Sequence, residues 1–586
     1  MFDYLIRLSL RFRGLTLGCA LILALAGVYA WFHLPIDAFP DISPTQAKVI
    51  LKIPGMTPEE VEQRVVKPIE QEMLSIPNKR IVRSISKYGI ADITIDFDEG
   101  VDIYWARQQV SERLNGVMRD LPASVSGGLA PISTPLSEVY MFTVEGADYS
   151  LAERRRVLDW VIRPELRTIA GVAEVNSLGG EVQSFEVIPN TAKMAALGVR
   201  LSDVRDALQA NNSNDGAGRI TAGEEALVVR VEGAVKTLDD LRAMRIPTRH
   251  ARKVQLDDVA TVTLGALTRY GAVTHDGQGE AVEGLVLGMR GVNARELVTA
   301  VDAKLTELAP RLPKGMTVHT FYNRGELVER AANTVIRALI EASVLVCITL
   351  YVFLGGVRAA LVVAVALPLS LLSTFLLMRA FGLTANLMSL GGLAIALGML
   401  VDAAVVVVEN IEAAFATHAG KHGLSKTEIL LRAVEQVVKP VASGVLIIGV
   451  VFLPLLTLEG LEGKLFVPVA LTIVMALSSS LLMAFTVIPA LASWLLQEEG
   501  AHEPPVVQKI HALYVRWRDR VWAQAQWLYR VSLGSLVVAV VLYTVVGKTF
   551  MPTLDEGDVL VQLQKIPSIS LVSSLEMDTR VQQAIL

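Results

Sequence analysis

The sequence predicts an integral membrane protein in which an α-helical bundle of about seven transmembrane spans carries a large α/β domain outside the bilayer. The first observation is composition: of 586 residues, 52% are hydrophobic and only 19% are charged, which is too apolar for a soluble protein. The second is that the apolar residues are gathered into blocks of spanning length. The third is a polar segment, residues 35–330, which is too long for a loop and predicts a folded extramembrane domain.

Seven apolar blocks predict the spans, and they occupy residues 14–33, 335–354, 359–380, 387–408, 441–458, 467–496 and 531–547. The first block follows basic residues, as a signal peptide would, but it lacks a small-residue cleavage site, so we expect a retained helix. The predicted organisation is a cytoplasmic segment with the first span (1–34), the outer domain (35–330), spans two to six (331–497), a cytoplasmic interfacial helix (498–530), span seven (531–548) and the start of a second outer domain (549–586).

Basic residues in the short loops predict the orientation. Arginines and lysines accumulate on one side of the predicted bundle, at Arg7, Arg11, Arg13, Arg358, Lys421, Lys426, Arg432, Lys439, Lys509, Arg516, Arg518 and Arg520. The short loops on the opposite side carry only Arg379 and Lys464. Because positive loops stay in the cytoplasm, the N-terminus is predicted to be cytoplasmic and the large domain to lie outside, which in a bacterium is the periplasm.

The outer domain begins with a pattern that alternates between strands and helices. Gln46–Ile53 alternates as a strand does, and Thr57 with Glu60 then predicts a capped helix that runs to about Leu74. A hairpin at Arg80–Phe97 and a helix at Asp102–Asp120 follow. This β-α-β-β-α order predicts a ferredoxin-like split unit.

A second such unit is predicted from Glu138 onward. Its expected parts are the strand that starts at Glu138, a helix at 151–169, a strand at Val182–Ile188, a strand at Gly284–Met289, a helix at Ala294–Leu308 and a strand at Thr317–Phe321. Residues 201–265 interrupt this order and predict an inserted subdomain, which with its flanks covers about 190–270.

The sequence after span seven resembles the sequence after span one. Lys548–Asp555 is followed by a strand-like run to Pro567, as His33–Asp37 is followed by a run to Pro54. Such a parallel repeat predicts a duplicated architecture, so we expect this chain to be a first half, from a truncated gene product or an amino-terminal fragment.

Asp402 is the most informative single residue, because it lies inside the apolar run Asn386–Asn410. A carboxylate near the centre of a bilayer costs about 3 kcal/mol on insertion scales, and such residues mark proton or ion pathways. Glu409 lies seven residues later on nearly the same helix face, although its position near the helix end also allows it to reach water. Glu341 lies inside the second span, where either a functional role or a pairing role explains it.

The sequence gives little support for a disulfide, a cysteine metal site, an enzyme active site or nucleic-acid binding. Cys19 and Cys347 both lie in apolar runs and predict neither a disulfide nor a metal site. The sequence contains no nucleophile–base constellation or phosphate loop that would favour an enzyme, and nothing in it suggests nucleic-acid binding. Gly391, Gly392 and Gly398 are small residues at which a neighbouring helix can approach closely.

Five motifs together resemble the resistance-nodulation-division (RND) efflux pumps, and most closely their heavy-metal branch. They are LPIDAFPDI (Leu34–Ile42), PGMTPEEVEQRVVKPIE (Pro54–Glu70), the stretch Ser84–Leu114, NNSNDGAGRI (Asn211–Ile220) and GMLVDAAVVVVEN (Gly398–Asn410). The resemblance implies a homotrimeric proton antiporter of the bacterial inner membrane that passes substrate to a periplasmic adaptor and an outer-membrane channel. Asp402 matches the family's proton-carrying aspartate. The implied function is proton-driven efflux of heavy-metal cations, with multidrug efflux or a truncated, non-transporting partner subunit as alternatives.

The resemblance also bears on the transported metal. Zinc, cobalt and cadmium pumps carry an additional Asp six residues before the main one, where this sequence has Ala396, and Asp402 is followed here by Ala403. The stretch is more similar to the copper and silver type, in which Met thioethers relay soft monovalent ions. Met388 matches a position of that relay and Met483 is a second candidate, with packing in an apolar core as the alternative for both. No resident cofactor is implied.

Overall fold

The computed structural model describes residues 2–37, 40–134, 137–247, 253–354, 356–418, 425–497, 505–522, 525–547, 559–566 and 568–586. The chain forms two compact units. Unit 1 comprises Met1–Ser137, Met289–Val298 and Arg324–Val561, and unit 2 comprises Glu138–Gly288, Thr299–Asn323 and Gln562–Leu586. Part of the predicted repeat motif, at 548–555, lies outside the described residues.

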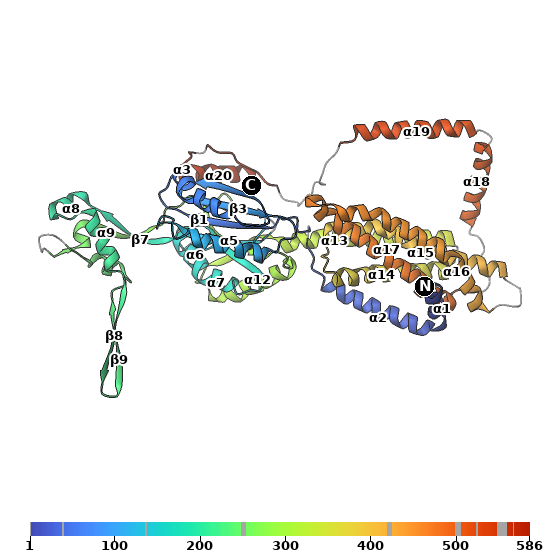
Figure 1. Cartoon of the computed structure of the whole chain (residues 1–586), viewed down its shortest axis with the longest axis horizontal. Helices are drawn as coiled ribbons and strands as arrows, with labels where there is room; N and C mark the ends of the chain where they lie inside the picture. The colour runs from blue at the N-terminus through green and yellow to red at the C-terminus, as the bar shows by residue number, and fades with distance from the viewer. Residues whose placement is uncertain are drawn as a thin grey trace. The chain divides into compact units, whose positions relative to one another are not determined.

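The long helices belong to unit 1, where α14 to α17 lie side by side (Figure 1). Seven helices in the described part of the chain are long and apolar enough to cross a membrane. They are α2 (Arg13–Phe32), α13 (Arg324–Leu354), α14 (Val357–Ala380), α15 (Leu387–His418), α16 (Lys426–Phe452) with the 3₁₀ turn η5 (Leu453–Thr457), α17 (Gly460–Leu495) and α19 (Ala525–Val545). Two amphipathic helices, α1 (Phe2–Arg11) and α18 (Pro505–Trp522), also belong to unit 1. Each predicted apolar block therefore falls on a helix, or on a helix and its terminal turn, and none extends more than two residues beyond it.

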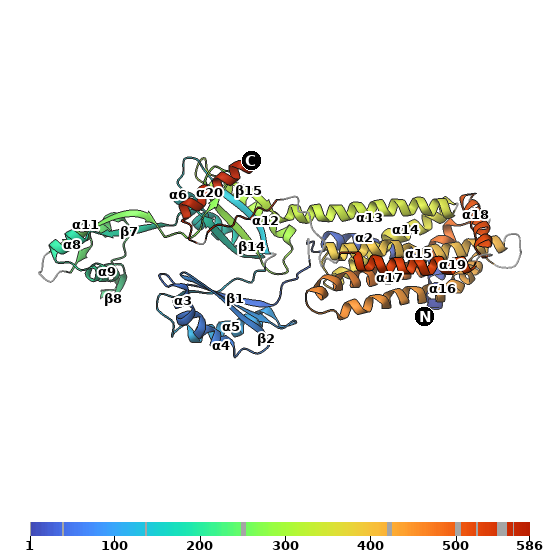
Figure 2. The same cartoon turned by 90° about the horizontal axis from the view of Figure 1, so that it is seen from above.

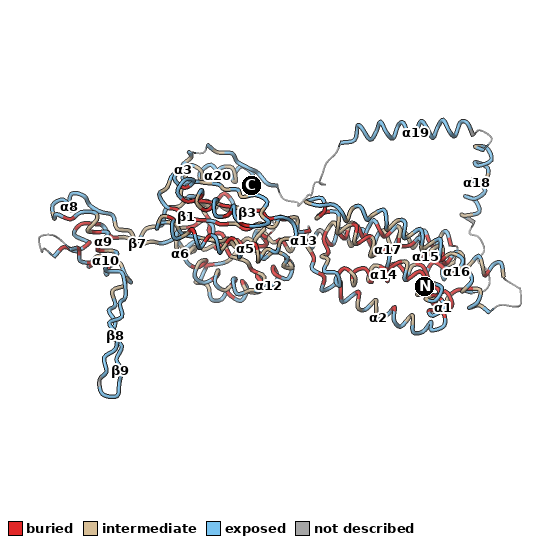
Figure 3. The backbone as a smooth tube through the Cα atoms, viewed as in Figure 1, coloured by how far each residue is buried: buried red, intermediate tan, exposed pale blue. Residues whose placement is uncertain are grey.

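Helices α15 and α17 form the centre of the bundle and run parallel. Gly392 of α15 lies against Val469 of α17, and further along both helices the Ser480 hydroxyl donates to the Leu400 carbonyl oxygen at 2.5 Å. Figure 3 shows buried residues along both helices, whereas α19 is exposed along its length, as expected for an apolar helix that faces lipid. The described part of the predicted interfacial helix (498–530) is divided between α18 and α19, so Trp527 belongs to the apolar helix α19.

Unit 1 also contains a four-stranded antiparallel sheet of order β2-β3-β1-β4 with its helices (Figure 2). In chain order its elements are β1 (Gln46–Lys52), α3 (Pro58–Val61), the π-helical turn η1 (Glu62–Val66), α4 (Lys67–Met73), β2 (Lys79–Lys87), β3 (Ile90–Phe97), α5 (Ile103–Val117) and β4 (Ser126–Leu129). The capping box predicted at Thr57 and Glu60 is present and starts α3. Alternate residues of β3, such as Ile93 and Ile95, are buried with Val110 of α5 in one core.

Unit 2 is built on a second antiparallel sheet of order β13-β14-β5-β15, in which β6 also pairs with β14. Its elements are β5 (Glu138–Glu145), α6 (Leu151–Val157), η3 (Leu158–Ile162), α7 (Arg163–Leu166), β6 (Val172–Gly179), β13 (Val273–Thr274), β14 (Glu280–Gly288), α12 (Ala294–Leu308), η4 (Ala309–Arg311), β15 (Thr317–Asn323) and α20 (Leu571–Ile585). The division between units falls within α12.

The strand predicted at Val182–Ile188 does not join this sheet. It forms β7 (Gln183–Pro189), which pairs with β12 (Ala260–Ala266), and the sheet position is taken by β6, which the sequence did not reveal. Gly179 and Gly180 both have positive φ angles, 65° and 66°, and they separate the two strands. This turn directs the chain out of the sheet into the β7–β12 ribbon.

The ribbon leads to the inserted subdomain predicted at about 190–270. It contains α8 (Thr191–Leu197), α9 (Leu201–Ala210), β8 (Asn214–Ala222), β9 (Glu225–Glu232), α10 (Leu238–Arg242), β10 (Arg245–Ile246), β11 (Val254–Gln255) and α11 (Leu256–Val259). A separate small core around Val204, Leu241 and Leu256 holds the helices together. The hairpin β8–β9 extends away from this core and is exposed along both strands (Figure 3).

Candidate functional site

Asp402 lines a groove of about 950 Å³ between α13, α15 and α16. Thr349 contributes a hydroxyl from α13, and Pro440 lines the opposite wall on α16. Glu409 lines the same groove from α15. The structure therefore brings Asp402 and Glu409 to one surface, as their seven-residue spacing predicts. Their separation along the helix axis is about 10 Å at 1.5 Å per residue.

The face of α15 that carries Asp402 differs from the face that packs in the bundle. Residues at helical spacing from Asp402, including Gly398 and Val405, line the groove, whereas Ala396, Leu400 and Val407 on other faces are buried. Ala396 is completely buried. A carboxylate at that position would be enclosed by the apolar core rather than face the groove, so the local packing suits the small apolar residue found here.

The groove has an unbalanced charge. Among the described residues that line it there are two carboxylates, Asp402 and Glu409, and no lysine, arginine or histidine. Both carboxylate residues are exposed to the groove. No cationic side chain of the described lining is available to neutralise them, so the two carboxyl groups stand in an otherwise largely apolar groove.

Helix α16 contains Pro440 at the groove, and because proline has no backbone N–H, the carbonyl group one turn earlier lacks its helical donor. Seven residues before Pro440, the Ala433 carbonyl oxygen accepts a hydrogen bond from the Asn410 side chain at 2.6 Å, which links α15 to α16. Sequence reasoning assigned no role to Thr349 or Pro440. The signal that would have found them is a polar residue and a proline inside apolar spans.

Glu341 does not join Asp402. It lies on α13 outside the described lining of the groove, and its Oε1 accepts a hydrogen bond from Arg337 Nε at 2.9 Å. Both side chains are largely exposed. The geometry accounts for Glu341 as an ion-pair partner within its own helix, and its predicted part in a proton relay has no contact to the groove.

The two candidate methionines do not form one site. Met483 is buried in an apolar cluster with Ala20, Leu369 and Val487, which is a packing environment. Met388 lies in the first turn of α15 and is half-buried. Since Leu400 lies level with Ser480 on the parallel helix, the two methionines are about 20 Å apart along the axes at 1.5 Å per residue.

A family comparison identifies this architecture. The model described as the AcrB/AcrD/AcrF family matches residues 5–586. The chain belongs to the AcrB/AcrD/AcrF family. Membership confirms the predicted RND relationship.

Several curated relatives share about a third of the sequence. The cation efflux system protein CzcA from Alcaligenes sp. (strain CT14) is 36% identical over 597 residues, which cover 99% of this chain and 56% of that protein. The cation efflux system protein CusA from Escherichia coli (strain K12) is 35% identical over 590 residues, covering 98% of this chain and 56% of that protein. Protein HelA from Legionella pneumophila is 38% identical over 598 residues, which cover 100% of this chain and 57% of that protein.

The fold also matches a solved structure. The X-ray crystal structure of a heavy metal efflux pump, crystal form I, superimposes with a TM-score of 0.87 at 32% identity and covers 99% of this chain and 56% of that chain. The chain thus spans about half the length of the relatives and of the solved structure that it matches.

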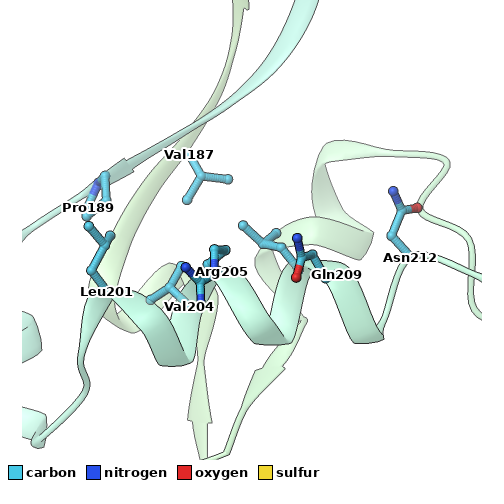
Figure 4. Close-up of a pocket in the computed structure, with 8 residues that line it drawn as sticks. Val187, Pro189, Leu201, Val204, Arg205, Gln209 and Asn212 are labelled. Atoms are coloured by element: carbon cyan, nitrogen blue, oxygen red, sulfur yellow. The ribbon is translucent and has the colours of Figure 1, made fainter. Parts of the chain in front are cut away.

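In this family member the inserted subdomain has a hollow of its own, of about 390 Å³ (Figure 4). It lies between β7 and α9, with Val187 on one side and Val204, Arg205 and Gln209 on the other. Its described lining contains no carboxylate, imidazole or sulfur atom, so it offers no set of metal ligands.

One buried carboxyl group stands out in unit 2. Glu283 on β14 is only 8% exposed, and burial together with the nearby charge of Glu138 raises the pKa of its carboxyl above the ordinary value. Burial dominates because a carboxylate in a desolvated sheet loses hydration that no cation replaces.

Proposed function

We propose that this chain forms part of an inner-membrane permease that exports metal cations from a bacterial cell in exchange for protons. The relatives named as cation efflux proteins and the similar heavy metal efflux pump support the class of cargo. The observation that carries the proton-coupled mechanism is the Asp402 groove, with two carboxylates and no cation among its described lining residues.

The proposed coupling follows from the charge of Asp402. An ionised carboxylate at mid-bilayer depth costs about 3 kcal/mol, and binding of a proton removes that cost. The protonated and ionised forms therefore favour different packing of α13 and α16 around α15. A proton can shift this equilibrium only by its differential affinity for the two arrangements. Asp402 is the proposed primary carrier and Glu409 the second group of the same path, while Glu341 is a predicted relay member outside the groove.

The class of metal is a further proposal with two alternatives. Ala396 and Ala403 favour the copper and silver type through the family resemblance, and Met388 and Met483 are its candidate ligands. Relatives named for cobalt, zinc and cadmium resistance are at least as similar to this chain as CusA is. Growth on copper or silver salts against growth on zinc, cobalt or cadmium salts separates the two classes.

We further propose a cytoplasmic N-terminus, periplasmic α/β parts and a homotrimer that works with an adaptor and an outer-membrane channel. The distribution of basic loop residues supports the orientation. The β8–β9 hairpin supports assembly, since both strands are exposed and an isolated two-stranded ribbon is only marginally stable in water. A contact with another chain would supply the missing packing. We propose that the ferredoxin-like units form the porter region through which cargo passes.

Growth assays on the full-length gene test the proposal. Asp402→Asn keeps the size of the side chain but cannot carry a proton, so we expect loss of metal tolerance to the level of a deletion strain. Asp519→Asn is the matched control, because it removes an exposed carboxylate on α18 that is paired with Arg518. Loss of dye and antibiotic tolerance without loss of metal tolerance would favour multidrug efflux. Full tolerance in the Asp402→Asn strain would contradict proton antiport and favour a non-transporting partner.

A further inference from the structure

Three metal-ligating side chains from distant parts of the sequence meet at one end of the unit 2 sheet. Glu145 ends β5, His319 lies on β15, and His275 directly follows β13. The Glu145 Oε1 atom is 3.8 Å from His275 Nδ1 and 3.9 Å from His319 Nδ1. One ligand atom from each residue lies within 4.8 Å of the other two. The sheet therefore presents two imidazoles and one carboxylate to a common point.

These distances suit a small transition-metal ion. Zinc binds histidine nitrogen at 2.0–2.1 Å and carboxylate oxygen at 2.0–2.2 Å in tetrahedral geometry, which places neighbouring ligand atoms about 3.4 Å apart. The separations of 3.8 and 3.9 Å exceed that value by about half an ångström. The third pair, His275 and His319, is within 4.8 Å, and rotation of these partly exposed side chains is the movement that would bring the three atoms around one ion.

The positions of the three residues are set by the strand pairing. Strands β15 and β5 are antiparallel, with His319 opposite Thr143 and Thr317 opposite Glu145. Glu145 and His319 are thus diagonal neighbours on one face, within reach of long side chains. His275 enters through the β13–β14 hairpin, where its N–H donates to the Gly279 carbonyl oxygen at 3.2 Å.

Two neighbouring groups lie beside the ligands. The Thr143 hydroxyl donates to Glu145 Oε1 at 2.9 Å. Asp276 Oδ2 lies 3.6 Å from Nε2 of His275, on the side of the ring opposite to the proposed ligand atom Nδ1. This contact is longer than a hydrogen bond, but Asp276 lies where a carboxylate usually supports the second ring nitrogen of a metal-bound histidine.

Helix α20 holds the hairpin loop that carries His275. The Gln582 side chain accepts from the Gly277 N–H at 3.1 Å and donates to the Thr274 carbonyl oxygen at 3.2 Å. Gln583 donates to the Gly277 carbonyl oxygen at 2.8 Å. These three hydrogen bonds fix the loop on both sides of His275, so the imidazole is presented by a supported turn rather than by a free loop.

We propose that Glu145, His275 and His319 form a binding site for a divalent transition-metal ion of the Zn²⁺ class on the extramembrane sheet. Two imidazoles and a carboxylate suit Zn²⁺, Co²⁺, Ni²⁺ or Cu²⁺, whereas Cu(I) and Ag(I) prefer sulfur and Ca²⁺ prefers six or more oxygens. Side-chain exposures of 25% for His275, 42% for Glu145 and 57% for His319 leave a coordination position open to water. The ion can then exchange with solvent, as a site that samples cargo requires, and this role rests on the proposed function in metal efflux.

Zinc binding by the purified full chain in detergent tests the site. The probe is Zn²⁺ alone, measured by competition with a chromophoric chelator, and Co²⁺ absorption reports tetrahedral nitrogen and oxygen ligation. His275→Gln, His319→Gln and Glu145→Gln each remove a ligand, and we expect each to weaken binding about 100-fold, at the upper end of the 10- to 100-fold typical for loss of an orienting partner. Asp276→Asn removes such a partner, so a loss of about 10-fold is expected.

His511→Gln is the matched control, since His511 is an exposed histidine of α18 in unit 1. It should bind Zn²⁺ as the unchanged chain does. Thermal unfolding of the metal-free variants checks that they fold. Equal Zn²⁺ affinity in all variants and the control would overturn the site. The outcome is independent of the transport assay. If the site binds Zn²⁺ and the Asp402→Asn strain keeps its metal tolerance, only the proposed function is contradicted. If that strain loses its metal tolerance and the site does not bind Zn²⁺, only this site is contradicted.

Discussion

Replacement of Gly392 by alanine tests how the bundle positions Asp402. A Cβ atom built on Gly392 would lie 2.9 Å from the backbone carbonyl oxygen of Val469 on α17 and 3.2 Å from its Cα. Ordinary contact begins at 3.4 Å, so the gap is short by 0.5 Å. The obstructing atoms are backbone and cannot rotate away. Helices α15 and α17 must therefore separate at this point.

The expected cost comes from the packing lost when the helices separate. Overpacked core substitutions typically cost about 1–3 kcal/mol. Gly391→Ala is a matched control on the same helix, because a Cβ atom there meets nothing within 4 Å. That control should be neutral, or more stable by up to about 1 kcal/mol from the helix propensity of alanine.

The midpoint of heat inactivation of the purified chain in detergent measures the difference. We expect Gly392→Ala to lower it by about 2–12 °C relative to Gly391→Ala, at roughly 2–4 °C per kcal/mol for chains of moderate size. A Gly392→Ala midpoint equal to or above that of the control would refute the close approach of α15 and α17. The inferred position of the Asp402 face would then also lack its support.

Two other substitutions probe buried charge. The Arg324 side chain is 6% exposed and donates a hydrogen bond to Asp37 at 2.8 Å. Asp37→Asn removes the charge of the acceptor, so it should destabilise unit 1 by about 1.5–3 kcal/mol, the usual worth of a hydrogen bond between charged groups. Chemical denaturation measures this loss, and an unchanged midpoint would contradict the ion pair. Because the folded state raises the pKa of Glu283, stability falls as pH rises above the ordinary value of 4.5. Glu283→Gln should therefore raise the thermal midpoint at pH 7–8 and lose this advantage at pH 4, whereas a gain independent of pH would argue against titration of Glu283.

Local patterns predicted much of the fold. The capping box at Thr57 starts α3, the helix expected at Ala294–Leu308 has those bounds, and every apolar block falls on a helical segment to within two residues of its end. The exchange of β6 for β7 could not be predicted, because pairing partners are distant in the chain and β6 carries a weak alternation. The two glycines at 179 and 180 mark the turn only once their φ angles are known.

The candidate site was predictable only in part. The i, i+7 spacing of Asp402 and Glu409 is a property of one helix, and both residues line the same groove. Whether Glu341 faces that groove depends on how α13 packs, which the sequence of α13 alone does not determine. The same limit applies to Gly391 and Gly392: a Cβ atom built on Gly392 would lie against α17, whereas one built on Gly391 would contact nothing within 4 Å. His275, His319 and Glu145 are separated by 44 to 174 residues, so only the sheet brings them together.

Metal-dependent proton flux in vesicles tests the central claim most directly. Full-length protein is reconstituted with a pH-sensitive dye inside, and a metal gradient is imposed with Zn²⁺ or Cu⁺ in separate experiments. We expect the unchanged protein and the Asp519→Asn control to move protons when a transported metal is present, and Asp402→Asn to reduce that flux to the level of empty vesicles. Metal-dependent proton flux at the unchanged rate in Asp402→Asn vesicles would contradict the assignment of Asp402 as the proton carrier.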